Sequence, residues 1–172
     1  MNQTLLVVGA LAITGALVFQ QQRSQTHTEI EAIEDKVAAG AHRVAVDWLA
    51  AHASLPFDRA LLTTDVVTGP LALSQPILPT CAVGAAGCPA SLDDLNGRIE
   101  QVVQTVGGSA VTYRLVATVS YALGDGTDAT TTLPTRHKKV TVTVSAPGVP
   151  AASRPAPLHL SELYPCGTAC AW

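Results

Sequence analysis

Apolar and polar residues are distributed very unevenly along this chain. The first charged side chain is Arg23, and residues 5–19 (LLVVGALAITGALVF) are almost purely apolar. Residues 20–54 contain no proline and a single glycine, and their apolar positions recur about every 3.6 residues while charged side chains occupy the other face. This pattern predicts one helix over about residues 3–54, apolar all round in its first half and amphipathic in its second.

Pro56 should end this helix, because the residue before a proline disfavours helical backbone. At 1.5 Å per residue, the helix would extend for about 75–80 Å. Its amphipathic half should pack on a globular domain through one apolar stripe. The stripe positions expected at this helix–domain contact are Ile30, Ile33, Val37, Val44 and Trp48.

Three explanations are possible for the apolar segment. A cleaved secretory signal would need a basic start and a small-residue cleavage site, and residues 1–23 show neither. A buried core helix would usually carry a polar stripe, which is missing here. The pattern favours an intact apolar helix, held in lipid or in a bundle of identical helices, although a bilayer span usually needs about 20 residues.

Glycine and alanine occur among the larger apolar side chains of this segment. Gly9 and Gly15 would permit close approach of a neighbouring helix, or local melting of the helix. The positions expected in the membrane or filament-core helix are Leu5, Leu6, Val7, Val8, Leu11, Ile13, Leu17, Val18 and Phe19.

After Pro56 the pattern becomes that of a small β domain. Residues 61–92 are rich in glycine and proline, which is typical of loops. Later runs are rich in β-branched residues, and two of them are expected to pair as an antiparallel hairpin across a Gly-Asp turn. The expected strand regions are residues 98–106, 110–123, 130–145 and 158–163.

Alternation assigns the faces of the two longest strand regions. Tyr113, Leu115, Ala117, Val119 and Tyr121 share one face of the first, and Val140, Val142 and Val144 share one face of the second. Pro134 and the pair Lys138-Lys139 suggest an edge strand or an irregular strand start. The expected fold class is α+β, a long N-terminal α-helix on a small antiparallel β-sheet, in three parts: the protruding helix 1–23, its amphipathic continuation 24–56 and a β-rich domain 57–172.

Four cysteines occur, at positions 81, 88, 166 and 170. An even number in an apparently exported chain suggests two disulfides, and three connectivities are possible. The simplest has two local loops, Cys81–Cys88 and Cys166–Cys170. A zinc site is the alternative, although neither spacing is the CxxC of zinc ribbons.

Composition narrows the class of protein. Hydrophobic residues make up 48% of the chain and charged residues 13%, which excludes a disordered charged tail because such tails combine high charge with low hydrophobicity. A net charge of −3 gives no reason to expect nucleic acid as a partner. Glycine and proline follow no fixed period, which excludes collagen.

Motifs for catalysis are missing from the sequence. The five histidines form no HExxH pattern, and there is no GxSxG, P-loop or dinucleotide fingerprint. The turn Asp125-Gly126-Thr127-Asp128 and the pair Asp93-Asp94 could bind calcium, but an ordinary turn is favoured at both. We therefore expect no enzyme activity, no cofactor and no metal.

In its layout the chain resembles the type IV pilin superfamily. The shared features are an uninterrupted apolar helix, an amphipathic second half and a β domain that ends in a cysteine loop. Individual motifs that look similar are residues 47–58 (DWLAAHASLPFD), residues 93–97 (DDLNG) and residues 138–145 (KKVTVTVS) followed by Leu158-His159-Leu160-Ser161. Most members carry a glutamate where this chain has Leu5, and the packing expectation does not depend on that residue.

The resemblance implies a structural subunit of an extracellular type IV pilus-like filament on the cell surface, with a precursor pool in the inner membrane. The expected partners are other copies of the chain in a helical homopolymer, the pilus assembly machinery, and the membrane before assembly. The alternative is a minor pilin or secretion pseudopilin, anchored in the inner membrane, that primes assembly. A third class is an anchored enzyme or ligand-binding domain.

Overall fold

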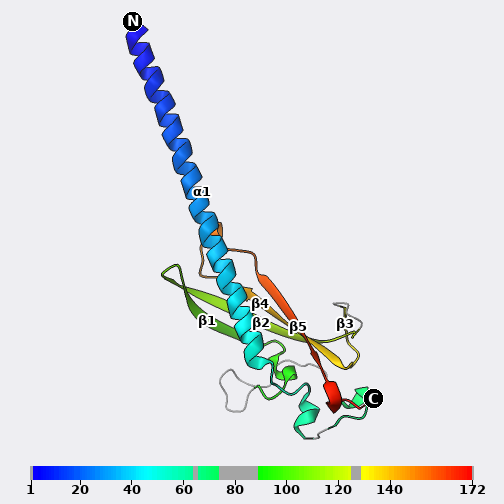
Figure 1. Cartoon of the computed structure of the whole chain (residues 1–172). Helices are drawn as coiled ribbons and strands as arrows, with labels where there is room; N and C mark the ends of the chain where they lie inside the picture. The colour runs from blue at the N-terminus through cyan, green and yellow to red at the C-terminus, as the bar shows by residue number, and fades with distance from the viewer. Residues whose placement is uncertain (1, 64–65, 74–88, 125–128, 172) are drawn as a thin grey trace.

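The computed structural model describes residues 2–63, 66–73, 89–124 and 129–171, with residues 2–13 described as helical backbone only. One helix, α1 (Asn2–His52), projects from a β domain and lies across it with its C-terminal half (Figure 1). The single long helix confirms the prediction and ends two residues before the expected position. The fold is α+β, with the helix packed on an antiparallel sheet.

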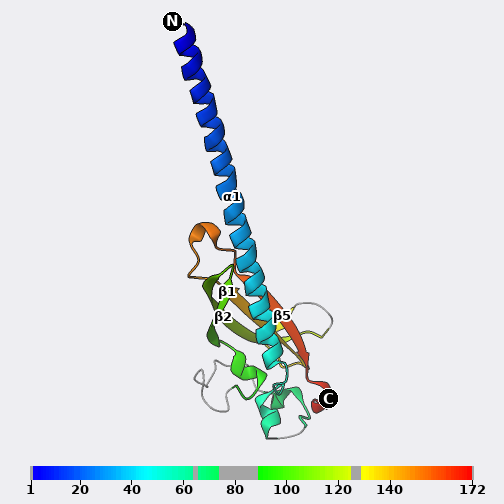
Figure 2. The same cartoon turned by 60° about the vertical axis from the view of Figure 1, so that its left-hand side comes forward.

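Within the described residues, five strands form this sheet in the order β1-β2-β4-β5, with the short β3 paired to the end of β2. All pairings are antiparallel, and α1 covers one face of the sheet (Figure 2). The strands are β1 (Ile99–Val106), β2 (Ser109–Ala122), β3 (Thr130–Thr131), β4 (His137–Ser145) and β5 (Leu158–Pro165). Short 3-10 helices lie between them: η1 (Arg59–Leu62), η2 (Pro70–Ala72), η3 (Leu92–Leu95), η4 (Ala151–Ser153) and η5 (Gly167–Ala169).

The core lies between α1 and the inner face of the sheet. The alternation predicted for β2 and β4 is confirmed, because every position assigned to the shared apolar faces is buried. From the helix side, the core receives Val37, Ala41, Val44, Ala45, Trp48 and Leu49. A two-residue turn, Gly107-Gly108, joins β1 to β2, with both glycines at positive φ, a conformation that side chains with a Cβ rarely adopt.

Of the two alternatives for Pro134 and Lys138-Lys139, an edge strand or an irregular strand start, the edge strand is wrong. Lys138 belongs to β4, which is hydrogen-bonded to β2 on one side and β5 on the other, and its side chain is 0% exposed. Alternation explains this position, since Lys138 has the same parity as the inward-facing Val140 and Val142. Pro134 does precede β4, where the chain between β3 and β4 is irregular.

At the C-terminal end, Cys166 and Cys170 form a disulfide with Cα atoms 5.7 Å apart, which confirms the local pairing predicted for them. The loop between them is fixed to the domain, because Val67 N–H donates to Ala169 O and Ala171 N–H donates to Val67 O. Cys81 and Cys88 lie outside the described residues.

Candidate functional site

The first candidate site is the projecting half of α1, defined here by residues 14–36. Most of its side chains are exposed, in contrast to the packed half, residues 37–52, where one face is buried. Leu17 is 61% exposed, Val18 51% and Phe19 67%. A Cβ added at Gly15 would meet no atom within 4 Å, so the surface beside it is open.

These apolar residues do not share one face of the helix. Consecutive residues on an α-helix are separated by about 100°, so Leu17, Val18 and Phe19 point in three directions that cover more than half of the circumference. A single partner lying on one side of the helix could not cover all three. Residues 2–13 are described as helical backbone only. This range contains Gly9 and the other predicted core positions Leu5, Leu6, Val7, Val8, Leu11 and Ile13.

Polar residues farther along the projecting half interact mainly within the helix. The Thr26 hydroxyl donates to Gln22 O at 2.9 Å, and the Thr28 hydroxyl donates to Gln25 O at 2.9 Å. His27 and Glu31 lie 3.7 Å apart and are 74% and 60% exposed. An exposed pair of this kind contributes little, about 0.3–0.5 kcal/mol, so it does not specify a partner.

Burial on the domain begins at Val37. Val37, Val44 and Trp48 are 2%, 3% and 7% exposed, whereas Ile33 remains 48% exposed and Ile30 is half-buried. Ile33 lies at a shallow groove whose other walls include Val106 and Val149. The buried helix–domain contact therefore begins at Val37, closer to the C-terminal end of α1 than Ile30 and Ile33, the first two positions predicted for it.

Ala41, which continues the same apolar stripe, is 4% exposed. Two further positions complete this contact and were not assigned from the stripe, Ala45 at 0% and Leu49 at 4% exposure. Their spacing of four residues was the available signal. Trp48 also has a polar anchor, because its indole N–H donates to Glu100 Oε2 at 2.9 Å.

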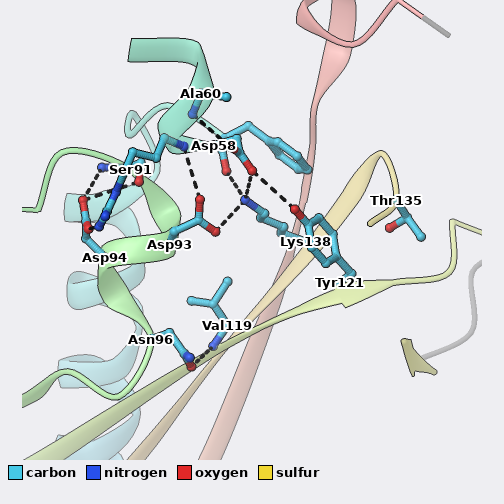
Figure 3. A network of polar contacts seen from close by, with 12 residues as sticks. Asp58, Ala60, Ser91, Asp93, Asp94, Asn96, Val119, Tyr121, Thr135 and Lys138 are labelled. Carbon is cyan, nitrogen blue, oxygen red and sulfur yellow. Dashed lines mark hydrogen bonds and ion pairs between the residues drawn. The ribbon is translucent and has the colours of Figure 1, made fainter. Parts of the chain in front are cut away.

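A second candidate site is a buried polar cluster where α1 ends, and sequence analysis missed it. Lys138 Nζ donates to Asp93 Oδ1 at 2.6 Å, to Asp58 Oδ2 at 2.8 Å and to Phe57 O at 2.8 Å (Figure 3). The Tyr121 hydroxyl donates to Asp58 Oδ2 at 3.3 Å. The three charged side chains are at most 1% exposed. They come from β4, η3 and the segment that follows α1.

The local backbone explains how the aspartates are held. Asp58 is the N-cap of η1, and its Oδ1 accepts from Ala60 N–H at 2.9 Å. η3 begins with a capping box in which Asp94 Oδ2 accepts from Ser91 N–H at 3.1 Å. The turn expected at Asp93-Asp94 is the 3-10 helix η3, but the sequence did not predict that both carboxylates are buried and bonded.

The pKa values of the two carboxyl groups of η3 are shifted in opposite directions. Burial raises the pKa of Asp93, and the adjacent Asp58 carboxylate adds to this, although the Lys138 ammonium opposes it. Burial alone would also raise the pKa of Asp94, but hydrogen bonds from the Arg59 guanidinium and from backbone N–H groups outweigh it and lower the pKa. Burial, together with the Asp58 and Asp93 charges, raises the pKa of the Tyr121 phenol.

The described residues contain no group of three or more His, Cys, Asp or Glu side chains that could hold a metal ion. Among residues whose side chains are described, no helical stretch combines the length and apolar character needed to cross a membrane.

Comparison with known proteins gives no match: no family model, no curated protein and no solved structure is significantly similar to this chain.

Proposed function

We propose that this chain is the structural subunit of an extracellular pilus-like filament, assembled by lateral packing of the apolar N-terminal helices. The observation that carries the proposal is the exposure of Leu17, Val18 and Phe19 on a helix that extends beyond its own domain. Contiguous exposed apolar surface of this kind marks a site of contact with other molecules or with lipid.

The free energy available from such packing is large. Burying about 15 residues of the Leu, Val, Ile and Ala type contributes on the order of 10–20 kcal/mol per subunit before the entropy costs of association. Lipid could cover the same surface before assembly. Transfer from lipid to a bundle would then depend on close packing, which the small residues Gly9 and Gly15 favour.

The directions of the exposed side chains favour a bundle over a simple dimer. Leu17, Val18 and Phe19 cover more than half of the helix circumference, so several neighbours are needed to enclose them. Identical subunits that meet in a head-to-tail relation form an open helical polymer. The projecting helices would form the core of this polymer and the β domains its outer layer.

The outer face of the sheet suits a solvent-facing layer. Thr118 and Arg114 of β2 are exposed on the side away from α1, and Thr143 of β4 is half-buried there. The Thr143 hydroxyl lies 3.0 Å from His159 Nδ1 of the neighbouring strand β5. These polar positions can meet water or the polar surface of an adjacent subunit, whereas Ile99 and Val103 of β1 expose apolar surface on the same face.

The test is electron microscopy of the purified protein, with one substitution in the projecting half and a matched control. Leu17→Asp places a charge in the proposed helix bundle and should abolish filaments while the β domain stays folded. Leu71→Asp changes an equally apolar residue that is 97% exposed on η2 and should leave filaments intact.

Normal filaments from Leu17→Asp would overturn the packing proposal. Composition of the native fibre provides a second test, because a structural subunit must be its dominant protein band. Recovery of the chain only as a trace component beside another subunit would instead support the anchored priming protein.

A further inference from the structure

One lysine and two aspartates meet in the interior of the β domain, shielded from solvent. Lys138 and Asp58 are 0% exposed and Asp93 is 1% exposed. The amine nitrogen is within 2.8 Å of an oxygen of each carboxyl group. The geometry is therefore that of an amine held in contact with two carboxyl groups at once.

The charges of this group do not balance if all three side chains are ionised. One ammonium faces two carboxylates, and the nearby Arg59 guanidinium is already paired with a third aspartate, Asp94. Two buried carboxylates that share one ammonium repel each other, which favours a proton on one of them.

The hydrogen bonds indicate which carboxyl holds the proton. Asp58 accepts from Ala60 N–H, from the Tyr121 hydroxyl and from Lys138, and donors of this kind favour a carboxylate. Asp93 accepts from Arg59 N–H at a longer 3.2 Å and from Lys138, and burial raises its pKa. Asp93 is thus the carboxyl that takes up a proton more readily, and its Oδ1 is also the carboxyl oxygen nearest to the amine.

We propose that Lys138 and Asp93 become joined by an intramolecular isopeptide bond between Nζ and Cγ, with Asp58 as the proton-transfer residue. The proposal depends only on this cluster and is independent of whether the chain forms filaments.

The bond forms by condensation, and no other reactant is needed. Lys138 first gives a proton to the Asp58 carboxylate, which leaves a neutral amine beside two neutral acids. The Nζ lone pair attacks Cγ of Asp93 and the N–C bond forms. Asp58 donates its proton to the departing hydroxyl and regains one from the nitrogen, so the C–O bond breaks and one water molecule leaves.

The site holds the reacting groups in contact and keeps them out of water. Lys138 Nζ lies 4.6 Å from the centre of the Phe57 ring and 5.1 Å from that of Tyr121, so aromatic rings line the site, although their faces attract an ammonium and do not themselves favour the neutral amine. Burial disfavours the carboxylate form of Asp93. Holding the reacting groups in contact also replaces a bimolecular encounter, an advantage that reaches effective molarities of about 10⁵–10⁸ M in favourable cases.

Peptide mapping of the wild-type protein tests the bond and identifies the aspartate in one experiment. Trypsin cuts after Arg43, Arg59 and Arg98, so Asp58 falls in peptide 44–59 and Asp93 in peptide 60–98. It does not cut after an acylated lysine, so a modified Lys138 stays in peptide 137–139. The protein is purified, denatured, reduced and alkylated before digestion and mass spectrometry.

The expected product is peptide 60–98 joined to peptide 137–139, lighter than their sum by one water molecule. Complete cleavage after Lys138, with peptide 60–98 unlinked, would overturn the proposal. A link from Lys138 to peptide 44–59 would overturn the assignment of Asp93 and of Asp58 as the proton-transfer residue.

Two variants test the assigned roles. Lys138→Met removes the amine and should yield only unlinked peptide 60–98, whereas the control Lys139→Arg should link as wild type. Asp58→Asn keeps the shape of the side chain but cannot accept the amine proton, so the linked fraction should fall severalfold in protein whose circular dichroism shows a folded domain. Wild-type linkage in folded Asp58→Asn would overturn its role in proton transfer.

Discussion

The projecting half of α1 keeps Leu17, Val18 and Phe19 more than half exposed, whereas the packed half buries Ala45 and Leu49 to 4% exposure or less. Both halves belong to one continuous helix and use the same kinds of apolar residue. They differ in what covers the apolar side chains. The sheet of the same chain covers those of the packed half, whereas no described part of the chain covers Leu17, Val18 or Phe19 of the projecting half. The comparison indicates that an apolar helix surface needs a covering surface, but its residues do not show whether that surface belongs to the same chain or to another molecule.

The largest expected difference between the halves concerns their aromatic side chains. Trp48→Ala removes a 7% exposed indole and its hydrogen bond to Glu100, and should lower the free energy of unfolding by about 3–5 kcal/mol. Phe19→Ala removes a 67% exposed ring and should change it by less than about 0.5 kcal/mol. Urea unfolding followed by near-ultraviolet circular dichroism measures both.

The same pair separates stability from assembly. Phe19→Ala should impair filament formation by a folded protein, because its ring belongs to the proposed bundle. A loss of domain stability in Phe19→Ala as large as that in Trp48→Ala would mean that the projecting half has a partner within its own domain.

An ion pair of the domain with a buried carboxylate and an exposed ion pair of the projecting half provide a second contrast, with a smaller expected change in the free energy of unfolding. Asp94→Asn replaces a buried carboxylate bonded to Arg59 and should lower the free energy of unfolding by about 1.5–3 kcal/mol at neutral pH, the usual range for hydrogen bonds to charged groups. Glu31→Gln replaces the exposed partner of His27 and should lower it by about 0.5 kcal/mol or less.

The pH dependence of this effect has a definite sign. The pKa of Asp94 is lower in the folded protein than in the unfolded chain, so its stabilisation is present above the unfolded pKa and is lost as pH falls through the folded pKa. The difference between wild type and Asp94→Asn should therefore shrink as the solution is acidified. A difference that stays constant down to acidic pH would show that Asp94 acts through shape and not through charge.

The regular parts of this fold were predictable because they depend on local pattern. The 3.6-residue period predicted the second half of α1 and the unbroken apolar run its first half, and alternation placed Tyr113 and Val119 on one face of β2 and Val142 on one face of β4. These signals act within about ten residues, so one sequence is enough to reveal them. The pairing of Cys166 with Cys170 was predictable for the same reason.

The buried cluster was not predictable by the same means. Alternation alone would have placed Lys138 on the inner face, but a lysine there requires a counter-charge that local pattern does not show. Its partners, Asp58 and Asp93, are 80 and 45 residues away along the chain. Two features of the sequence could have indicated the cluster. Lys138 has the parity of the inward-facing residues of its strand, and the acidic pair Asp93-Asp94 lies between two leucines.

Two glycines of α1 provide the smallest and most local comparison. A Cβ at Gly40 would overlap the hydroxyl of Tyr113, whose O–H donates to Val37 O at 3.0 Å, and would lie 3.3 Å from Val106 Cγ2. Gly40→Ala should therefore lower the free energy of unfolding by about 1–3 kcal/mol, the range for overpacked cores. Gly15→Ala meets no atom within 4 Å and should instead favour the helix by about 0.5–1 kcal/mol without affecting the domain.

A double-mutant cycle shows whether the Tyr113 hydroxyl is the cause. Tyr113→Phe alone loses the hydrogen bond to Val37 and should lower the free energy of unfolding by about 0.5–1.5 kcal/mol. In the Gly40→Ala background the same change also removes the overlapping oxygen, so the double variant should be more stable than the sum of the two single effects. Simple additivity in thermal or urea unfolding would mean that α1 shifts on the sheet to accommodate the methyl group, and that the packed half is held less rigidly than its burial indicates.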